Sequence, residues 1–198
     1  MTPASVARGR ELPRKTLHLT TASIPVGLWL GIPQQAIAAV LVALFGVACL
    51  VELTRRRSSA FADRFTSAVG GMLRPHEVRN GITGATWLLA AFALTLLVAP
   101  RAAAIAATWA GAVGDALAAI VGSSWSRWRG ITGKTHAGSV ACAVVAALGA
   151  FGLAGFGLAA AAALGVLAAL VERPAVDVDD NVRVTLAVAI GAVVLLRI

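Results

Sequence analysis

Long apolar segments joined by short polar connections constrain the fold of this chain more than any other feature. A helix needs about 20 apolar residues to cross a bilayer, and seven segments approach that length. They cover residues of about 17–32, 34–53, 82–99, 102–122, 137–153, 156–171 and 182–196. The last two are short and rich in alanine, so we expect six or seven spans.

The composition also indicates a membrane protein. Hydrophobic residues make up 59% of the 198-residue chain, charged residues make up 13%, and the mean hydropathy is +0.84. A soluble domain is only about 45–50% apolar. Because a segment alone in a bilayer must satisfy its own backbone hydrogen bonds, these spans should be helical. We therefore predict an all-α, polytopic transmembrane helix bundle, with residues 1–198 forming one domain.

The only long polar segment, residues 54–83, contains a helical pattern of its own. Apolar side chains recur every four residues among polar neighbours, at Phe61, Phe65, Val69 and Leu73. This spacing predicts a short amphipathic helix that lies in the membrane interface.

The basic residues predict an orientation. With the N-terminus inside, all of the 17 lysines and arginines except Arg101 and Arg197 fall on the cytoplasmic side, as the positive-inside rule requires. The acidic residues and histidines also lie on or near that side. We expect a bacterial inner (plasma) membrane protein with a cytoplasmic N-terminus and site, and no nucleic-acid partner.

The first polar cluster lies in the segment ELPRKTLHL. Its charged and titratable residues are spaced i, i+3, i+4 and i+7 on one helical face: Glu11, Arg14, Lys15 and His18. A basic membrane anchor explains Arg14 and Lys15, but it does not explain a histidine that continues the face into the apolar zone. We favour a functional role.

The second cluster, LRPHEVRNGITGAT, directly precedes the third apolar segment. It places Arg74, His76, Glu77 and Arg79 close together in sequence. A solvated loop can have the same composition, so this cluster alone favours neither a functional nor a structural role.

Asp115 is the most informative residue, because it lies inside an apolar segment. It precedes Gly122 by seven residues, which places it roughly 10 Å inside the helix end. A carboxylate at the centre of a membrane helix costs about 2.5–3.5 kcal/mol and predicts a functional site. The small residues Gly111, Gly114 and Ala118 share its face, so an interhelical hydrogen bond is the structural alternative.

The segment GITGKTHAGS contains GKT but is not a P-loop. Trp128 stands where that motif requires its first glycine, and no strand precedes the segment. Its glycines instead predict a nest of backbone N–H groups for an anion, with Lys134 as a point charge. The predicted phosphate-binding residues here are Gly133, Lys134, Thr135, Gly138 and Ser139.

The fourth cluster, VERPAVDVDDNVRV, lies between the last two apolar segments. Plain N-capping by Asp180 and Asn181 is one interpretation. Nucleotide-bound Mg²⁺, however, is typically held by one or two carboxylates together with phosphates and water. We predict Asp115, Glu172 and Asp180 as its ligands.

Taken in order, these blocks resemble the family of dolichol kinase, phytol kinase and CTP-dependent diacylglycerol kinase. The matching residues are ELPRKTLH, then RPHE with TGAT, GDALAAIVG, GKTHAGS, and finally Glu172 with Asp180-Asn181. The chain departs from the family at His136-Ala137, where members often carry an acidic residue. The resemblance implies transfer of the terminal phosphate of a nucleoside triphosphate, with CTP favoured, to a lipid alcohol. The implied acceptors are a polyprenol, phytol or another isoprenoid alcohol, or diacylglycerol.

We assign roles to these residues as hypotheses. Lys134, Arg14 and Lys15 hold the triphosphate, and His18 or Asp115 takes the proton from the lipid hydroxyl. The remaining polar site residues are Glu11, His76, Glu77 and Asn181. Two alternatives stay open: a CTP-dependent cytidylyltransferase acting on a lipid phosphate, and a non-enzymatic membrane carrier or lipid-binding protein.

Overall fold

The computed structural model describes residues 16, 18–78, 81–124, 134–173 and 179–197, and these residues are all-α, without a strand. Its α-helices are α2 (Ser23–Trp29), α3 (Gln34–Arg57), α4 (Ser59–Val69), α5 (Pro75–Val78), α6 (Gly84–Val98), α7 (Arg101–Trp109), α8 (Asp115–Ser124), α9 (His136–Gly152), α10 (Leu158–Glu172) and α11 (Asp180–Leu195). A 3₁₀ turn, η1 (Gly70–Met72), follows α4, and a π-helical segment, η2 (Ala110–Gly114), joins α7 to α8.

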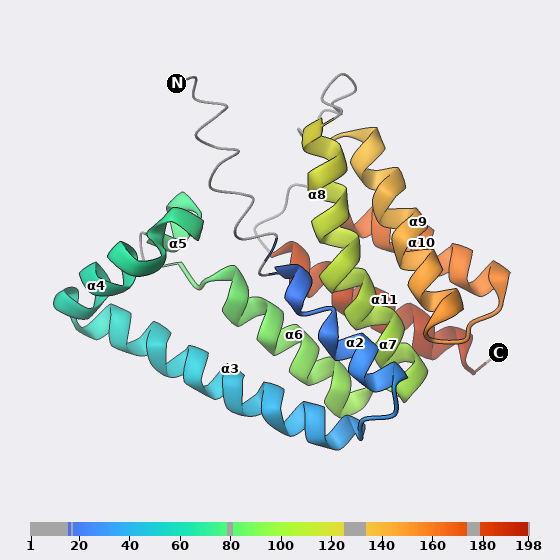
Figure 1. Cartoon of the computed structure of the whole chain (residues 1–198), viewed down its shortest axis with the longest axis horizontal. Coiled ribbons are helices and arrows are strands. Elements are labelled where there is room, and N and C mark those ends of the chain that lie inside the picture. Colours follow the sequence, from blue (N-terminus) through green and yellow to red (C-terminus); the bar gives the residue numbers. More distant parts are fainter. Residues whose placement is uncertain (1–15, 17, 79–80, 125–133, 174–178, 198) are drawn as a thin grey trace.

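The helices form two neighbouring groups. In Figure 1, α3 runs alongside α6, and α4 and α5 lie together at one end of that pair. In the second group, α9 packs against both α8 and α10, and α11 packs against α7 and α10. Because α11 also packs against α6, it contacts both groups.

The first apolar segment does not form one continuous helix. A turn at Thr21 and Ala22 separates the helical residues 18–20 from α2. Proline at position 25 has no N–H to donate to the carbonyl of Thr21 four residues earlier, and its ring crowds that carbonyl. The chain therefore makes the shorter bond from Ile24 N to Thr21 O. The predicted span over 17–32 is interrupted for this reason.

Two helices in the described part are long and apolar enough to cross a bilayer: α3 and the continuous stretch Arg101–Ser124. The first is 17% buried over its apolar window and the second is 72% buried. Helices α6, α9 and α10 are apolar but shorter. The 15 residues of α6 rise about 22 Å, less than a hydrocarbon core of about 30 Å. The predicted number of spans therefore stays a prediction.

Small residues let the helices of the second group approach closely. A Cβ added to Gly165 in α10 would lie 2.3 Å from the backbone oxygen of Ala143 in α9. A Cβ on Gly149 would lie 2.0 Å from the ring of Trp109. Glycine at these two positions is required by close approach rather than by backbone conformation. Close approach of the helices thus lets a core made largely of short side chains pack densely.

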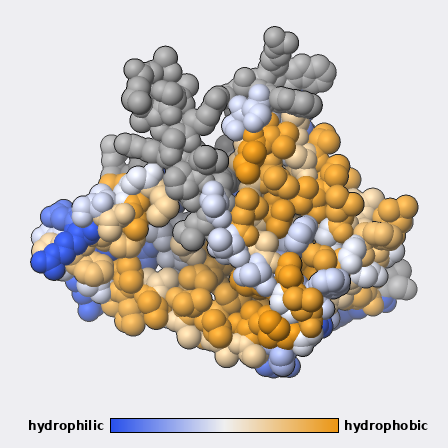
Figure 2. Space-filling model, viewed as in Figure 1, coloured by the Kyte–Doolittle hydropathy of each residue, from blue (hydrophilic) through white to orange (hydrophobic). Residues whose placement is uncertain are grey.

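The predicted amphipathic helix is present as α4 as far as Val69, whereas Leu73 lies beyond η1 in an extended conformation. Ser58 caps α4 by accepting a hydrogen bond from Phe61 N. None of its residues is fully buried. Phe65 faces back toward α3, where the Arg55 guanidinium lies 4.5 Å from the centre of its ring. In Figure 2, hydrophilic residues gather at this corner of the molecule, while apolar residues cover much of the visible face of the neighbouring helices.

Candidate functional site

The π-helical segment η2 ends immediately before Asp115. A π turn carries an extra residue and leaves backbone groups out of the regular helical ladder, and such turns are frequent at functional sites. Gly111 lies within this turn and against α11, since a Cβ there would lie 2.3 Å from Thr185 Oγ1. Thus α11 fixes the position of the turn that carries Asp115.

His18 approaches this turn from the N-terminal segment. Its Nε2 lies 2.8 Å from the Gly111 carbonyl oxygen and 3.9 Å from Asp115 Oδ2. Because a carbonyl oxygen can only accept, Nε2 carries the proton and donates it to Gly111. Both side chains are largely buried, with exposed fractions of 10% and 11%. The predicted catalytic residues His18 and Asp115 are therefore brought together.

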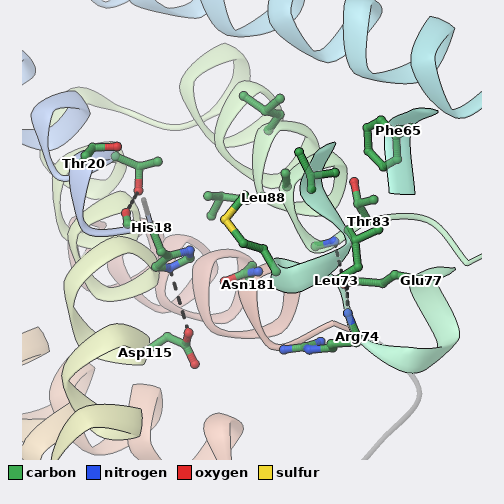
Figure 3. Close-up of a pocket in the computed structure, with 16 residues that line it drawn as sticks. His18, Thr20, Phe65, Leu73, Arg74, Glu77, Thr83, Leu88, Asp115 and Asn181 are labelled. Carbon is green, nitrogen blue, oxygen red and sulfur yellow. Dashed lines mark hydrogen bonds and ion pairs between the residues drawn. The ribbon is translucent and has the colours of Figure 1, made fainter. Parts of the chain in front are cut away.

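These two residues lie at one end of a cavity of about 370 Å³. Figure 3 shows Asn181 between the His18 and Asp115 pair and the segment that carries Leu73 and Arg74. The cavity walls are mainly apolar and come from α4, η1 and α6, with side chains of Phe65, Val69, Met72, Leu73, Leu88 and Leu89. The cavity therefore has a few polar side chains at one end and mainly apolar side chains along its walls, as many ligand pockets do.

Asn181 enters the cavity from the first turn of α11. Its side chain is buried, at 8% exposed, and its Oδ1 has no hydrogen-bond partner among the described residues. The alternative interpretation, in which Asp180 and Asn181 cap the helix, is wrong, because Asp179 precedes the helix and accepts from Asn181 N at 3.0 Å. Asn181 Oδ1 is thus available to the cavity.

Lys134 lies with two of the predicted metal ligands. Its Nζ is 2.6 Å from Glu172 Oε1 and 3.0 Å from Asp180 Oδ2. Burial alone would lower the pKa of this ammonium, but the hydrogen bonds and negative charges of Glu172 and Asp180 outweigh it and raise the pKa above 10.5. Asp180 also accepts a hydrogen bond from Arg183. The pattern is a compact ion cluster between the starts of α9 and α11 and the end of α10.

The third predicted metal ligand does not join this cluster. Asp115 lines the cavity beside His18, whereas Glu172 and Asp180 converge on Lys134. Within the described ranges, no three His, Cys, Asp or Glu side chains form a group that could hold a metal ion. Asp115 therefore lies apart from the other two predicted ligands, Lys134 pairs with both Glu172 and Asp180, and the binding of Mg²⁺ by these carboxylates stays a prediction.

Gly130 and Gly133 of the predicted anion nest lie outside the described residues, so the nest stays a prediction, and the described part of the segment begins at Lys134. Thr135 caps α9, and its Oγ1 accepts a hydrogen bond from Gly138 N at 3.1 Å. Ser139 Oγ donates to Thr135 O at 3.4 Å. Gly138 lies against α8, where an added Cβ would be 2.6 Å from Ala118 O. These three residues start and pack α9, and Lys134 alone keeps a charge directed at the ion cluster.

Glu77 is buried at 3% exposed and holds together the segment beside the cavity. Its carboxylate accepts from Arg74 N at 2.8 Å and from Gly84 N at 3.0 Å. The Arg55 guanidinium donates to the Glu77 backbone oxygen at 2.7 Å and forms an ion pair with Glu52 at 2.9 Å. We therefore assign Glu77 a positioning role.

Sequence reasoning missed Glu52 and Arg55. The available signal was an acidic and a basic residue three positions apart at the end of an apolar segment, a spacing that places both on one helical face. Glu52 Oε1 accepts from Thr83 N at 2.9 Å, which ties α3 to the start of α6.

Several predicted site residues lie outside the described residues: Glu11, Arg14, Lys15 and Gly133. The side chain of His76 is also outside them, although its backbone belongs to α5.

Comparison with protein-family models, with curated proteins and with solved structures gave no match. The assignment of function therefore rests on the residues and on their arrangement.

Proposed function

We propose that this chain is an integral membrane kinase that transfers the terminal phosphate of a nucleoside triphosphate, with CTP favoured, to the hydroxyl of a lipid alcohol. The observation that carries the proposal is the cavity of about 370 Å³, whose apolar walls lead to the buried pair His18 and Asp115. A lipid alcohol matches this arrangement, because it has a long apolar chain and one polar end.

The surface of the helices supports a place in the bilayer. Much of α3 is covered by exposed apolar side chains, which in water would form an unusually large apolar patch. The exposed residues include Val40, Leu44, Val47 and Leu50. We propose six or seven spans, with α4 in the interface and the cavity opening within reach of lipid from the cytoplasmic leaflet.

Asp115 is the better candidate for the group that accepts the hydroxyl proton. His18 Nε2 already donates to the Gly111 carbonyl, so that nitrogen has no lone pair for a second proton. The Asp115 carboxylate lies 3.9 Å from the same nitrogen and lines the cavity. We assign His18 to holding Asp115 and the π turn in place, and Asp115 to proton acceptance.

The reaction balances with these groups. The alcohol oxygen forms a bond to the terminal phosphorus while the bond from that phosphorus to the bridging oxygen breaks. The alcohol proton goes to Asp115, and the nucleoside diphosphate leaves with the bond electrons. Such transfer needs positioning and neutralisation of charge more than covalent chemistry by the protein.

Lys134 supplies a positive charge for the nucleoside triphosphate, which is the phosphate donor. Its ammonium is compact and carries three donors, so it can exchange the oxygens of Glu172 and Asp180 for phosphate oxygens. These two carboxylates both lie within 3.0 Å of one cation, so the pair suits the small number of carboxylates that hold Mg²⁺ with a nucleotide. When bound, Mg²⁺ would neutralise charge on the phosphate oxygens.

A panel of acceptors tests the proposal. Purified protein in lipid nanodiscs is incubated with Mg²⁺ and CTP or ATP labelled in the terminal phosphate. Phytol, farnesol, polyprenol and diacylglycerol serve as acceptors. We expect labelled lipid monophosphate with at least one alcohol and more of it from CTP. Absence of label from every lipid, with protein that is folded, would contradict the kinase assignment.

A further inference from the structure

We propose that Asn181 is the group that recognises the hydroxyl of the lipid ligand, by accepting its hydrogen bond at Oδ1. This inference rests on the proposed function of the cavity as the alcohol site. It adds a selectivity determinant: the cavity should distinguish an alcohol from a lipid of the same shape whose oxygen carries no proton.

The first argument is the state of the Asn181 side chain. A buried polar atom without a hydrogen bond is costly, and most such atoms in folded proteins have a partner. Asn181 Oδ1 is buried and has none among the residues that the structure describes. Its backbone N–H is engaged with Asp179 Oδ1, so Asn181 is not needed as the cap of α11. We therefore infer that Asn181 Oδ1 accepts a hydrogen bond from a ligand bound in the cavity.

The second argument is position. Asn181 lines the cavity together with Asp115 and His18, and Figure 3 places it between that pair and the apolar side chain of Leu73. A hydroxyl at this end of the cavity can donate to Asn181 Oδ1 while its carbon chain lies along the walls formed by α4, η1 and α6. A hydroxyl has a single proton, so Asn181 Oδ1 accepts its hydrogen bond in the bound state, and rotation about the C–O bond then turns the O–H from Asn181 to Asp115 for proton transfer.

The other polar groups of the cavity are occupied by protein contacts. Glu77 accepts from the backbone N–H groups of Arg74 and Gly84. Arg74 is paired with Asp179 at 3.0 Å. Thr83 Oγ1 lies 3.0 Å from Thr86 Oγ1. An uncharged acceptor remains at Asn181, which suits a neutral hydroxyl better than a phosphate or a carboxylate, since both of these only accept at neutral pH.

The test compares two ligands of nearly the same shape in the absence of nucleotide. Dissociation constants of farnesol and of farnesyl methyl ether are measured on the protein in nanodiscs. The ether cannot donate and leaves Asn181 Oδ1 unpaired. We expect wild-type protein to bind farnesol about tenfold more tightly than the ether, the effect of one buried acceptor left without its donor.

Variants assign that preference to Asn181. Asn181→Leu keeps the approximate size but removes the acceptor, so the ratio of the two constants should fall to about one. Asn181→Asp keeps an oxygen acceptor and should retain the preference for farnesol. Thr95→Val removes a buried hydroxyl from α6 that bonds to Ala91 O and does not line the cavity, so it should leave the ratio unchanged. Thermal unfolding of each variant establishes that it is folded.

A ratio near one in wild-type protein, or an undiminished ratio in folded Asn181→Leu protein, would overturn the inference. The two proposals fail separately. If the ratio depends on Asn181 but no alcohol is phosphorylated, the cavity recognises alcohols and the kinase assignment fails. If phosphate is transferred and the ratio does not depend on Asn181, only the present inference fails.

Discussion

Asp115 lies at the polar end of the cavity with 11% of its side chain exposed, and His18, whose Nε2 is 3.9 Å from it, already donates a proton to a backbone carbonyl. Replacement by asparagine keeps the size of the side chain and removes its charge and basicity. We expect Asp115→Asn to lower phosphate transfer by about 100-fold or more, the usual effect of losing a general base. Stability should hold or rise, because a neutral amide is easier to bury than a carboxylate.

The measurement is the rate of phosphate transfer beside thermal unfolding, for wild type and variant. Asp63→Asn provides a matched control, because Asp63 is exposed on α4 and does not line the cavity. The control should transfer phosphate at the wild-type rate. Near-normal transfer by Asp115→Asn would show that Asp115 serves only as a hydrogen-bonding group between helices.

Lys134 gives a prediction with a defined pH window. Its pKa is raised above the ordinary 10.5, since Glu172 and Asp180 favour the charged form more than burial disfavours it. A group with a raised pKa in the folded state stabilises the fold below its unfolded pKa and loses that effect as pH rises through the folded value. The unfolding temperature of wild type should therefore exceed that of Lys134→Met at neutral pH, and the difference should shrink only above about pH 10.5.

Thermal unfolding at a series of pH values measures this difference. Lys134→Arg keeps the charge and should keep most of the stability, but its planar fork should replace the compact ammonium poorly in nucleotide use. A stability difference that already disappears between about pH 7 and 9 would contradict the ion cluster as its cause.

At the scale of single residues, the sequence predicted which side chains are chemically important better than it predicted their partners. The unusual depth of Asp115 in an apolar segment was visible from spacing alone, and so was a polar histidine at position 18. The pairing of Lys134 with Glu172 and Asp180 was not visible, because it joins the ends of three helices that are separated by a long stretch of chain. Opposite charges were therefore predicted as separate ligands of phosphate and of metal.

Among the elements, the π-helical segment η2 controls where Asp115 points. Gly111 is its close contact with α11, and an added Cβ would lie 2.3 Å from Thr185 Oγ1 and 3.0 Å from the Phe92 ring. We expect Gly111→Ala to destabilise the protein by about 1–3 kcal/mol through overpacking and to reduce phosphate transfer. Gly46→Ala on α3 has no atom within 4 Å of the new methyl group and should be neutral or stabilising.

Denaturant titration measures the stability of Gly111→Ala, of Gly46→Ala and of the double variant Gly111→Ala/Thr185→Ala. The double variant tests whether overpacking against Thr185 causes the loss of stability. The combined variant removes the nearest clashing atom and should recover part of the stability. If Gly111→Ala and Gly46→Ala are equally stable, close packing of η2 against α11 is not what fixes the π turn.

Hydropathy predicted most element positions because each described apolar segment after the first contains a helix. It did not predict the turn at Thr21 and Ala22, although Pro25 was a local signal for it. It also could not predict η2, since an extra residue in a helix is set by contacts with α11 and α9 rather than by the period of apolar side chains.

For the whole molecule, the account requires the polar clusters to lie on one side of the membrane. We expect single cysteines at Ser58 and Ser124 to react with a membrane-impermeant maleimide from the cytoplasmic side only. The background protein should lack both native cysteines, Cys49 and Cys142. Labelling of the two positions from opposite sides would separate α4 from the end of α8 and would contradict a common cytoplasmic site.

The most direct test of the central claim follows both ends of one CTP molecule. Protein in nanodiscs with Mg²⁺ receives CTP that carries different phosphorus isotopes at its first and terminal phosphates. The acceptor is a lipid alcohol in one reaction and the corresponding lipid monophosphate, the substrate of a cytidylyltransferase, in another. The account predicts the terminal label in lipid monophosphate and the first label in CDP. The first label in the lipid, together with release of pyrophosphate, would instead indicate a cytidylyltransferase, and no label in any lipid would contradict phosphate transfer altogether.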